Sequence, residues 1–178
     1  MPEAPIAPML WLGIPMKILV ATNGSVGSKA AIRFADRLAA GLRDPEVVVV
    51  TVGALRRELL GQSDGSEDGM LGPELEREES QIAQRVLTAA EKDLRKCHRQ
   101  ATFRFVKPRQ LAPVAETIAR EADREKADLI VVGTDRLAVF ATWALGSVSA
   151  RLLQVARRPV TVVRVGPAAT PSAATARV

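Results

Sequence analysis

Small polar residues and glycine follow two apolar runs of this chain. The range Thr22–Ser25 (Thr-Asn-Gly-Ser) follows the run Ile18–Ala21, and the range Gly133–Asp135 (Gly-Thr-Asp) follows the run Leu129–Val132. Such residues supply hydroxyl, amide and main-chain hydrogen-bonding groups, and glycine lets a ligand approach the backbone closely. If the two runs are neighbouring strands of a parallel sheet, their carboxyl ends border one crevice, where ligands bind in open α/β sheets.

A third feature of this kind is the pair Gly146-Ser147, which precedes a helical pattern containing Val148 and Leu152. Ser147 is expected to cap that helix, whose first N–H groups and positive dipole end attract anions. Gly146 would let a phosphate approach the main chain. Simple helix capping and phosphate binding both remain open interpretations of this pair.

Common catalytic motifs are absent: the chain has no Walker A lysine motif, HExxH, GxSxG or CxxC. Asp135 is the one candidate general base near the crevice, and its charge could equally repel a phosphate. The spacing of Asp64, Ser66 and Asp68 imitates a calcium loop, but Leu75 stands where the twelfth-position Glu is required. The sequence therefore predicts no catalytic residue and no metal ligand.

The elements that must position these residues are five β-branched runs that alternate with segments of helical periodicity. The runs are Ile18–Ala21, Val47–Val52, Thr102–Val106, Leu129–Val132 and Val160–Val165. The helical stripes are Ala31, Phe34, Ala35, Leu38 and Leu42; Ile82, Val86, Ala90, Leu94 and Cys97; Leu111, Ala115, Ile118 and Ala122; and Val148, Leu152 and Val155. Strict alternation predicts an α/β fold, a three-layer α/β/α sandwich with a five-stranded parallel sheet. The polar–apolar alternation of Thr102–Val106 is typical of an edge strand.

The two ends of the chain and one connection differ from this pattern. Residues 1–15 are Pro-rich and lack the basic segment of a secretory signal, so we expect a loose arm. Residues 166–178 have the composition of a disordered tail, which leaves 16–165 as the domain. The connection 53–73 is long and acidic, and we expect it to be a mobile loop. A single Cys and the lack of a membrane-length apolar run indicate a cytoplasmic protein.

The net charge of +5 is unevenly distributed along the chain. Between Arg136 and Val165 there are five Arg and no acid, whereas Gln62 to Ser80 holds seven acids and one base. This asymmetry predicts an anionic ligand near the C-terminal end of the domain. Nucleic acid is an unlikely partner, because the chain has only four Phe, two Trp and no Tyr for base stacking.

Four segments resemble the universal stress protein family: Ile18–Ser25, Ala127–Gly133, Leu145–Ser149 and Arg158–Val163. The resemblance implies a doubly wound sheet of order 3-2-1-4-5, of the adenine-nucleotide alpha-hydrolase-like type. It implies a homodimer, formed through the fifth strand with Val160, Val162, Val163 and Val165. In one subfamily it also implies ATP at the switch point between strands one and four, with Mg or Mn held only through the phosphates.

The family's nucleotide signature is glycine, two residues, glycine, nine residues, then glycine and Ser or Thr. Gly133, Gly146 and Ser147 match it, but Arg136 replaces the second glycine, and Asn23 stands where members often have aspartate. Arg136 could close the phosphate pocket or bring a cation to the phosphates. The candidate nucleotide-binding residues that the resemblance implies are Ala21, Thr22, Asn23, Val52, Val132, Gly133, Asp135, Arg136, Gly146, Ser147, Val148 and Ser149.

Three functions follow as hypotheses. The first is a stress-response regulator that binds ATP or another adenine nucleotide and acts through dimerisation. The second is a dimeric adaptor whose pocket, altered by Arg136 and Asn23, takes no nucleotide. The third is a weak ATPase that depends on Asp135.

Overall fold

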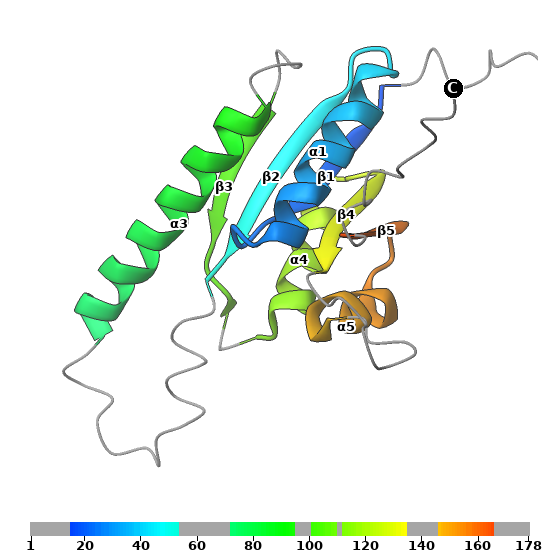
Figure 1. The fold of residues 1–178 in the computed structure, drawn as a ribbon. Helices are drawn as coiled ribbons and strands as arrows, with labels where there is room; N and C mark the ends of the chain where they lie inside the picture. The colour runs from blue at the N-terminus through cyan, green and yellow to red at the C-terminus, as the bar shows by residue number, and fades with distance from the viewer. Residues whose placement is uncertain (1–14, 54–71, 95–100, 110–111, 135–145, 166–178) are drawn as a thin grey trace, which may run out of the picture.

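The computed structural model describes residues 15–53, 72–94, 101–109, 112–134 and 146–165 (Figure 1). Nearly all of the predicted N-terminal arm, most of the 53–73 loop and the C-terminal tail lie outside these ranges, as do the stripe residues Leu111 and Cys97. The elements in chain order are β1 (Lys17–Ala21), α1 (Val26–Ala40), β2 (Glu46–Val52), α3 (Gly72–Leu94), β3 (Ala101–Val106), α4 (Val114–Arg124), β4 (Leu129–Thr134), α5 (Ser147–Val155) and β5 (Val160–Arg164).

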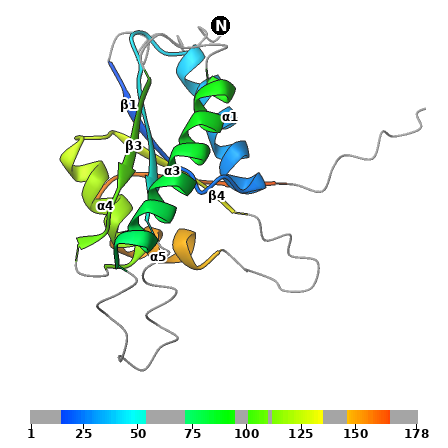
Figure 2. The same ribbon diagram turned by 90° about the vertical axis from the view of Figure 1, so that its left-hand side faces the viewer.

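The five strands form one parallel sheet in the order β3-β2-β1-β4-β5, which confirms the predicted fold. The winding reverses at β1, which pairs with β2 on one side and with β4 on the other. Helices α1 and α3 cover one face of the sheet, and α4 and α5 cover the other (Figures 1 and 2). The carboxyl ends of β1 and β4 therefore lie side by side at the switch point, as the sequence predicted.

Successive residues of the central strand β1 belong to different layers of the core. Ile18 and Val20 pack in the cluster beneath α1 and α3, whereas Leu19 packs in the cluster beneath α4 and α5. All three are completely buried, because a strand with neighbours on both sides and helices on both faces has no contact with water. Burial of each such side chain contributes roughly 1.5–3 kcal/mol.

Helix α3 departs from the predicted stripe. Ile82, which we expected to face the core, is 41% exposed, and the buried residues are Ala83, Leu87, Ala90 and Leu94. These four repeat at helical spacing, and α3 packs through this narrow face over β2 and β3. The helix begins at Gly72, so Pro73 belongs to its first turn and not to the preceding loop. Proline is tolerated there because its missing N–H would have no partner within the helix.

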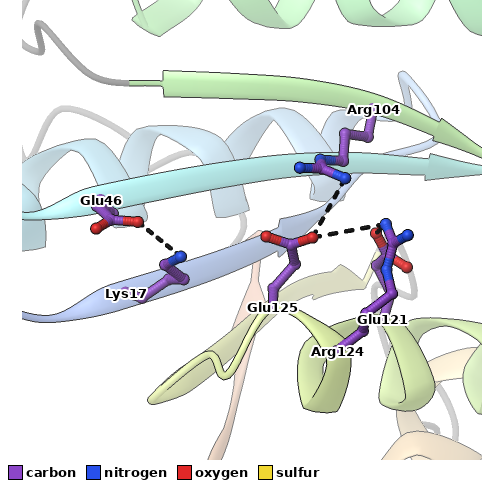
Figure 3. A network of polar contacts seen from close by, with 6 residues as sticks. All are labelled: Lys17, Glu46, Arg104, Glu121, Arg124 and Glu125. Carbon is purple, nitrogen blue, oxygen red and sulfur yellow. Dashed lines mark hydrogen bonds and ion pairs between the residues drawn. The ribbon is translucent and has the colours of Figure 1, made fainter.

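An ionic cluster fastens the end of α4 to the edge strand β3 (Figure 3). Arg104 of β3 lies 3.3 Å from the carboxylate of Glu125, and Arg124 lies 3.5 Å from the same carboxylate. Arg124 also pairs with the buried carboxylate of Glu121, and this side-chain hydrogen bond raises the pKa of the Arg124 guanidinium. A separate pair, Lys17–Glu46 at 2.7 Å, joins the starts of β1 and β2. The Arg104–Glu125 pair joins the end of α4 to β3, and α4 also borders the cavity described next through Val114 and Ile118.

Candidate functional site

A cavity of about 120 Å³ opens at the carboxyl ends of β1, β2 and β4. Seven predicted nucleotide-binding residues line it: Ala21, Thr22, Asn23, Val52, Val132, Gly133 and Val148. Five lining residues were not predicted: Ser25, Ser28, Val50, Val114 and Ile118. The cavity lies at the predicted switch point, and three of the four lining residues that belong to helices (Ser28, Val114 and Ile118) were not predicted.

One wall of the cavity is wholly apolar. It combines Val50, Val52 and Val132 from the strands with Val114 and Ile118 from α4. Ile118 is almost completely buried and was recognised in the sequence only as a core residue of its helix. A cavity wall of aliphatic side chains suits a flat apolar or aromatic group, which loses contact with water on entry.

The opposite wall is polar and is built on the turn after β1. The Asn23 Oδ1 accepts a hydrogen bond from the Ser25 N–H at 3.1 Å, and the Thr22 Oγ1 accepts one from the Gly24 N–H at 3.2 Å. Gly24 has a φ of +82°, in the left-handed region that favours glycine. These bonds hold the turn in one shape and leave the Asn23 amide nitrogen with no protein partner in the described part of the chain.

The first turn of α1 completes the polar wall. Ser25 caps this helix, since its Oγ accepts a hydrogen bond from the Ser28 N–H at 3.3 Å. The Thr22 hydroxyl donates to the Ser28 Oγ at 3.1 Å, and the Ser28 hydroxyl donates to the Ser25 carbonyl at 3.0 Å. The positive end of the α1 dipole therefore borders the cavity. A serine directly before a helical segment, as Ser25 is, is an N-cap signal that can be recognised in the sequence.

Gly133 lines the cavity and also has a packing role that the sequence did not reveal. A Cβ at this position would lie 1.9 Å from the carbonyl oxygen and 2.1 Å from the carbonyl carbon of Gly27, in α1. Both atoms belong to the backbone, so only glycine lets α1 approach β4 this closely. The fit of α1 onto the sheet accounts for Gly133 independently of any phosphate.

The predicted residues around the start of α5 divide into three groups. We expected Ser147 to be the N-cap of α5, but the N-cap is Gly146. The Gly146 N–H donates a hydrogen bond to the Thr134 Oγ1 at 3.4 Å. Ser147 is the first residue of the helix and is exposed. Val148 lines the cavity and is 37% exposed, so the prediction that it packs in the core stripe with Leu152 was wrong. Ser149 is buried and does not line the cavity, and Asp135 and Arg136 lie outside the described residues.

We predicted that the arginines between Arg136 and Val165 would attract an anion. Two of them, Arg151 and Arg158, are paired with carboxylates instead. Arg151 lies 2.8 Å from the Glu116 carboxylate, and Arg158 lies 3.1 Å from that of Asp123, so both are neutralised by acids of α4. No charged side chain lines the cavity among the described residues. Any attraction for an anion must therefore come from helix N-termini and polar groups in this part of the molecule.

No group of three or more metal-ligating side chains occurs within the described ranges. No helix in the same ranges has the length and apolar character needed to cross a membrane.

The chain is a doubly wound α/β protein with a cavity at its switch point that is apolar in one part and polar in another. The model of the universal stress protein family matches residues 16–164, and the chain belongs to this family. No curated protein sequence matches the chain.

Solved structures share the fold. A universal stress family protein from Burkholderia pseudomallei is 29% identical, with a TM-score of 0.59, covering 83% of this chain and 94% of that one. One from Arabidopsis thaliana, with AMP bound, is 17% identical (TM-score 0.61; 89% and 97% covered). The universal stress protein from Archaeoglobus fulgidus, in complex with dAMP, is 22% identical (TM-score 0.58; 84% and 98% covered).

Proposed function

We propose that this protein binds an adenine nucleotide, with ATP as its physiological ligand, in the switch-point cavity and acts as a regulator in stress response. The observation that carries the proposal is the cavity itself, in which an aliphatic wall faces a wall of hydroxyl and amide groups. Two distantly related proteins of the same fold hold AMP and dAMP. The domain of 16–165 is proposed to work in the cytoplasm, in keeping with its single Cys.

The residues present fit the parts of a nucleotide. The base would lie against the aliphatic wall, beside Val52 and Ile118, and the sugar would lie beside Thr22 and Asn23. The phosphates would extend toward Gly146 at the start of α5, where N–H groups and the helix dipole attract anions. Mg or Mn would be held through the phosphates. None of the described residues that line the cavity is an acid, and Asp135, the candidate general base, lies outside the described ranges.

We also propose that the protein acts as a homodimer through β5. This strand is an edge of the sheet, and Val160, Val162 and Val163 are only partly buried in the single chain. Val165 follows the strand, which ends at Arg164. An edge strand with partly exposed β-branched residues is a surface that a second copy can cover.

Replacing Val148 by Glu is expected to weaken ATP binding by about tenfold or more, measured by titration calorimetry, because a carboxylate at the cavity rim repels phosphates. The substitution should leave the fold intact, since Val148 is partly exposed and an acid in the first turn of a helix is favourable. AMP binding should be weakened less than ATP binding, because AMP carries fewer negative charges.

Leu153→Glu is the charge-matched control. Leu153 is 49% exposed on the same helix and does not line the cavity, so ATP affinity should change by less than about twofold. If the parent protein releases no heat with ATP or AMP, the nucleotide proposal is wrong, and the alternative of a dimeric adaptor without nucleotide is favoured. Equal losses in the two variants would show that ATP does not bind at this cavity.

A further inference from the structure

A second hollow, of about 390 Å³, lies on the outer surface between α4 and α5, apart from the switch-point cavity. Ala119 and Val155 contribute an apolar floor, and Glu116, Arg120, Asp123 and Arg157 contribute charged side chains. We call this surface the α4–α5 groove. Glu116 and Asp123 are seven residues apart on α4, which corresponds to roughly 10 Å along the helix, or about three residues of an extended peptide.

The two acids of the groove are already paired. Arg151 of α5 lies 2.8 Å from Glu116, and Arg158, which follows α5, lies 3.1 Å from Asp123. The first pair joins the two helices, and the second joins α4 to the segment that follows α5. Both acids are therefore neutralised by partners that also fix the spacing of the walls.

The two remaining cations have no carboxylate within 4 Å in the part of the chain that the structure describes. Arg157 makes no ion pair there, and Arg120 donates only to the Glu116 carbonyl at 3.3 Å and to the Thr117 hydroxyl at 3.4 Å. Those two bonds hold the Arg120 side chain along the helix and leave other N–H groups available. The groove thus presents two unpaired guanidiniums over an apolar floor, a combination suited to carboxylates on a peptide.

The same helices also border the switch-point cavity, through different residues. Val114 and Ile118 of α4 line the cavity, whereas Glu116, Ala119 and Arg120 line the groove. Val148 at the start of α5 lines the cavity, and Val155 at its end lines the groove. The groove is therefore formed by the two helices that lie over the proposed nucleotide site.

We propose that the α4–α5 groove is a docking site for a short acidic segment of a partner protein, in which carboxylates pair with Arg120 and Arg157 and a small apolar side chain rests on Ala119 and Val155. A peptide matches this surface better than a nucleic acid does. The alternation of acids and arginines along the groove would repel a continuous phosphate backbone at Glu116 and Asp123. A peptide of alternating acidic and apolar residues meets both the cations and the floor.

The test is fluorescence anisotropy with the full-length protein and a labelled peptide in which Glu alternates with Ala and Leu. The parent protein should bind this peptide, and binding should weaken as salt is raised. The double variant Arg120→Glu, Arg157→Glu should raise the Kd by about tenfold or more. Its circular dichroism spectrum and melting temperature should remain close to those of the parent, since both side chains are exposed.

The matched control is Arg33→Glu, Arg37→Glu, which makes the same change in net charge on the exposed side of α1, in the opposite helical layer. This variant should bind the peptide with a Kd within about twofold of the parent value. The proposal is overturned if the parent binds no peptide, if the control variant loses as much affinity as the groove variant, or if neither loses any. It is also overturned if a DNA oligonucleotide of equal charge displaces the peptide at lower concentration. None of these results depends on nucleotide binding.

Discussion

Replacing Gly133 by Ala is expected to lower the free energy of unfolding by about 3 kcal/mol or more. The added Cβ would lie 1.9 Å from the Gly27 carbonyl oxygen and 2.6 Å from the Ser28 backbone nitrogen. No rotamer change can relieve this overlap, because both atoms are part of the α1 backbone. The helix would have to move away from β4, and its contacts with Val20 and Val131 in the buried core would loosen.

Gly146→Ala is the matched control for this prediction. A Cβ at Gly146 would lie 3.5 Å from the Thr134 Oγ1, which is an ordinary contact, and the backbone angles of −57° and 151° are open to alanine. We expect a destabilisation of at most about 1 kcal/mol, because glycine is a better N-cap than alanine, measured by urea unfolding of both variants beside the parent. Similar destabilisation by the two substitutions would contradict the packing role of Gly133.

Gly133→Ala and Gly146→Ala are also expected to differ in how they affect nucleotide binding. Both match the phosphate signature that the family resemblance implies, but a Cβ at Gly146 would make only an ordinary contact, whereas a Cβ at Gly133 would overlap the α1 backbone. Under the proposed function, Gly146→Ala weakens ATP binding while stability is retained. Gly133→Ala loses binding through the displacement of α1, so its effects on binding and stability should appear together.

Leu152→Ala is expected to destabilise the protein by roughly 2 to 5 kcal/mol. Leu152 is completely buried, in the cluster that contains Leu19 and Ile130, and it is the one fully buried apolar side chain of α5. A helix of nine residues does not persist in water without such packing. The melting temperature should fall by roughly 10 °C, which differential scanning calorimetry can measure.

Leu153→Ala makes the identical chemical change one position further along α5. Because Leu153 is 49% exposed, its removal should change stability by less than about 0.5 kcal/mol. A similar loss in both variants would show that α5 is not anchored through Leu152. Since Leu152 fixes the helix that begins after Gly146, its replacement should also weaken any binding of phosphates there.

The part of the site that could be predicted from the sequence comes from strand ends. The family resemblance implied Ala21, Val52 and Val132, and these residues line the cavity because parallel strands have their carboxyl ends at one edge of a sheet. The helical contributions were harder to predict. In α3, Ile82 and Ala83 are adjacent and both apolar, and only the position of the helix over β3 shows that Ala83 is the buried one.

The amino-acid sequence by itself determined the alternation of strands and helices and the location of the crevice, and its resemblance to a family supplied the strand order. The alternation and the crevice follow from local periodicity and from the order of the elements along the chain. The tertiary structure alone decided that Gly133 packs against Gly27, that Ile118 forms a cavity wall, and that Arg151 and Arg158 are paired with acids of α4. Each of these depends on atoms that are distant in sequence and come within a few ångströms only when helices are packed on the sheet.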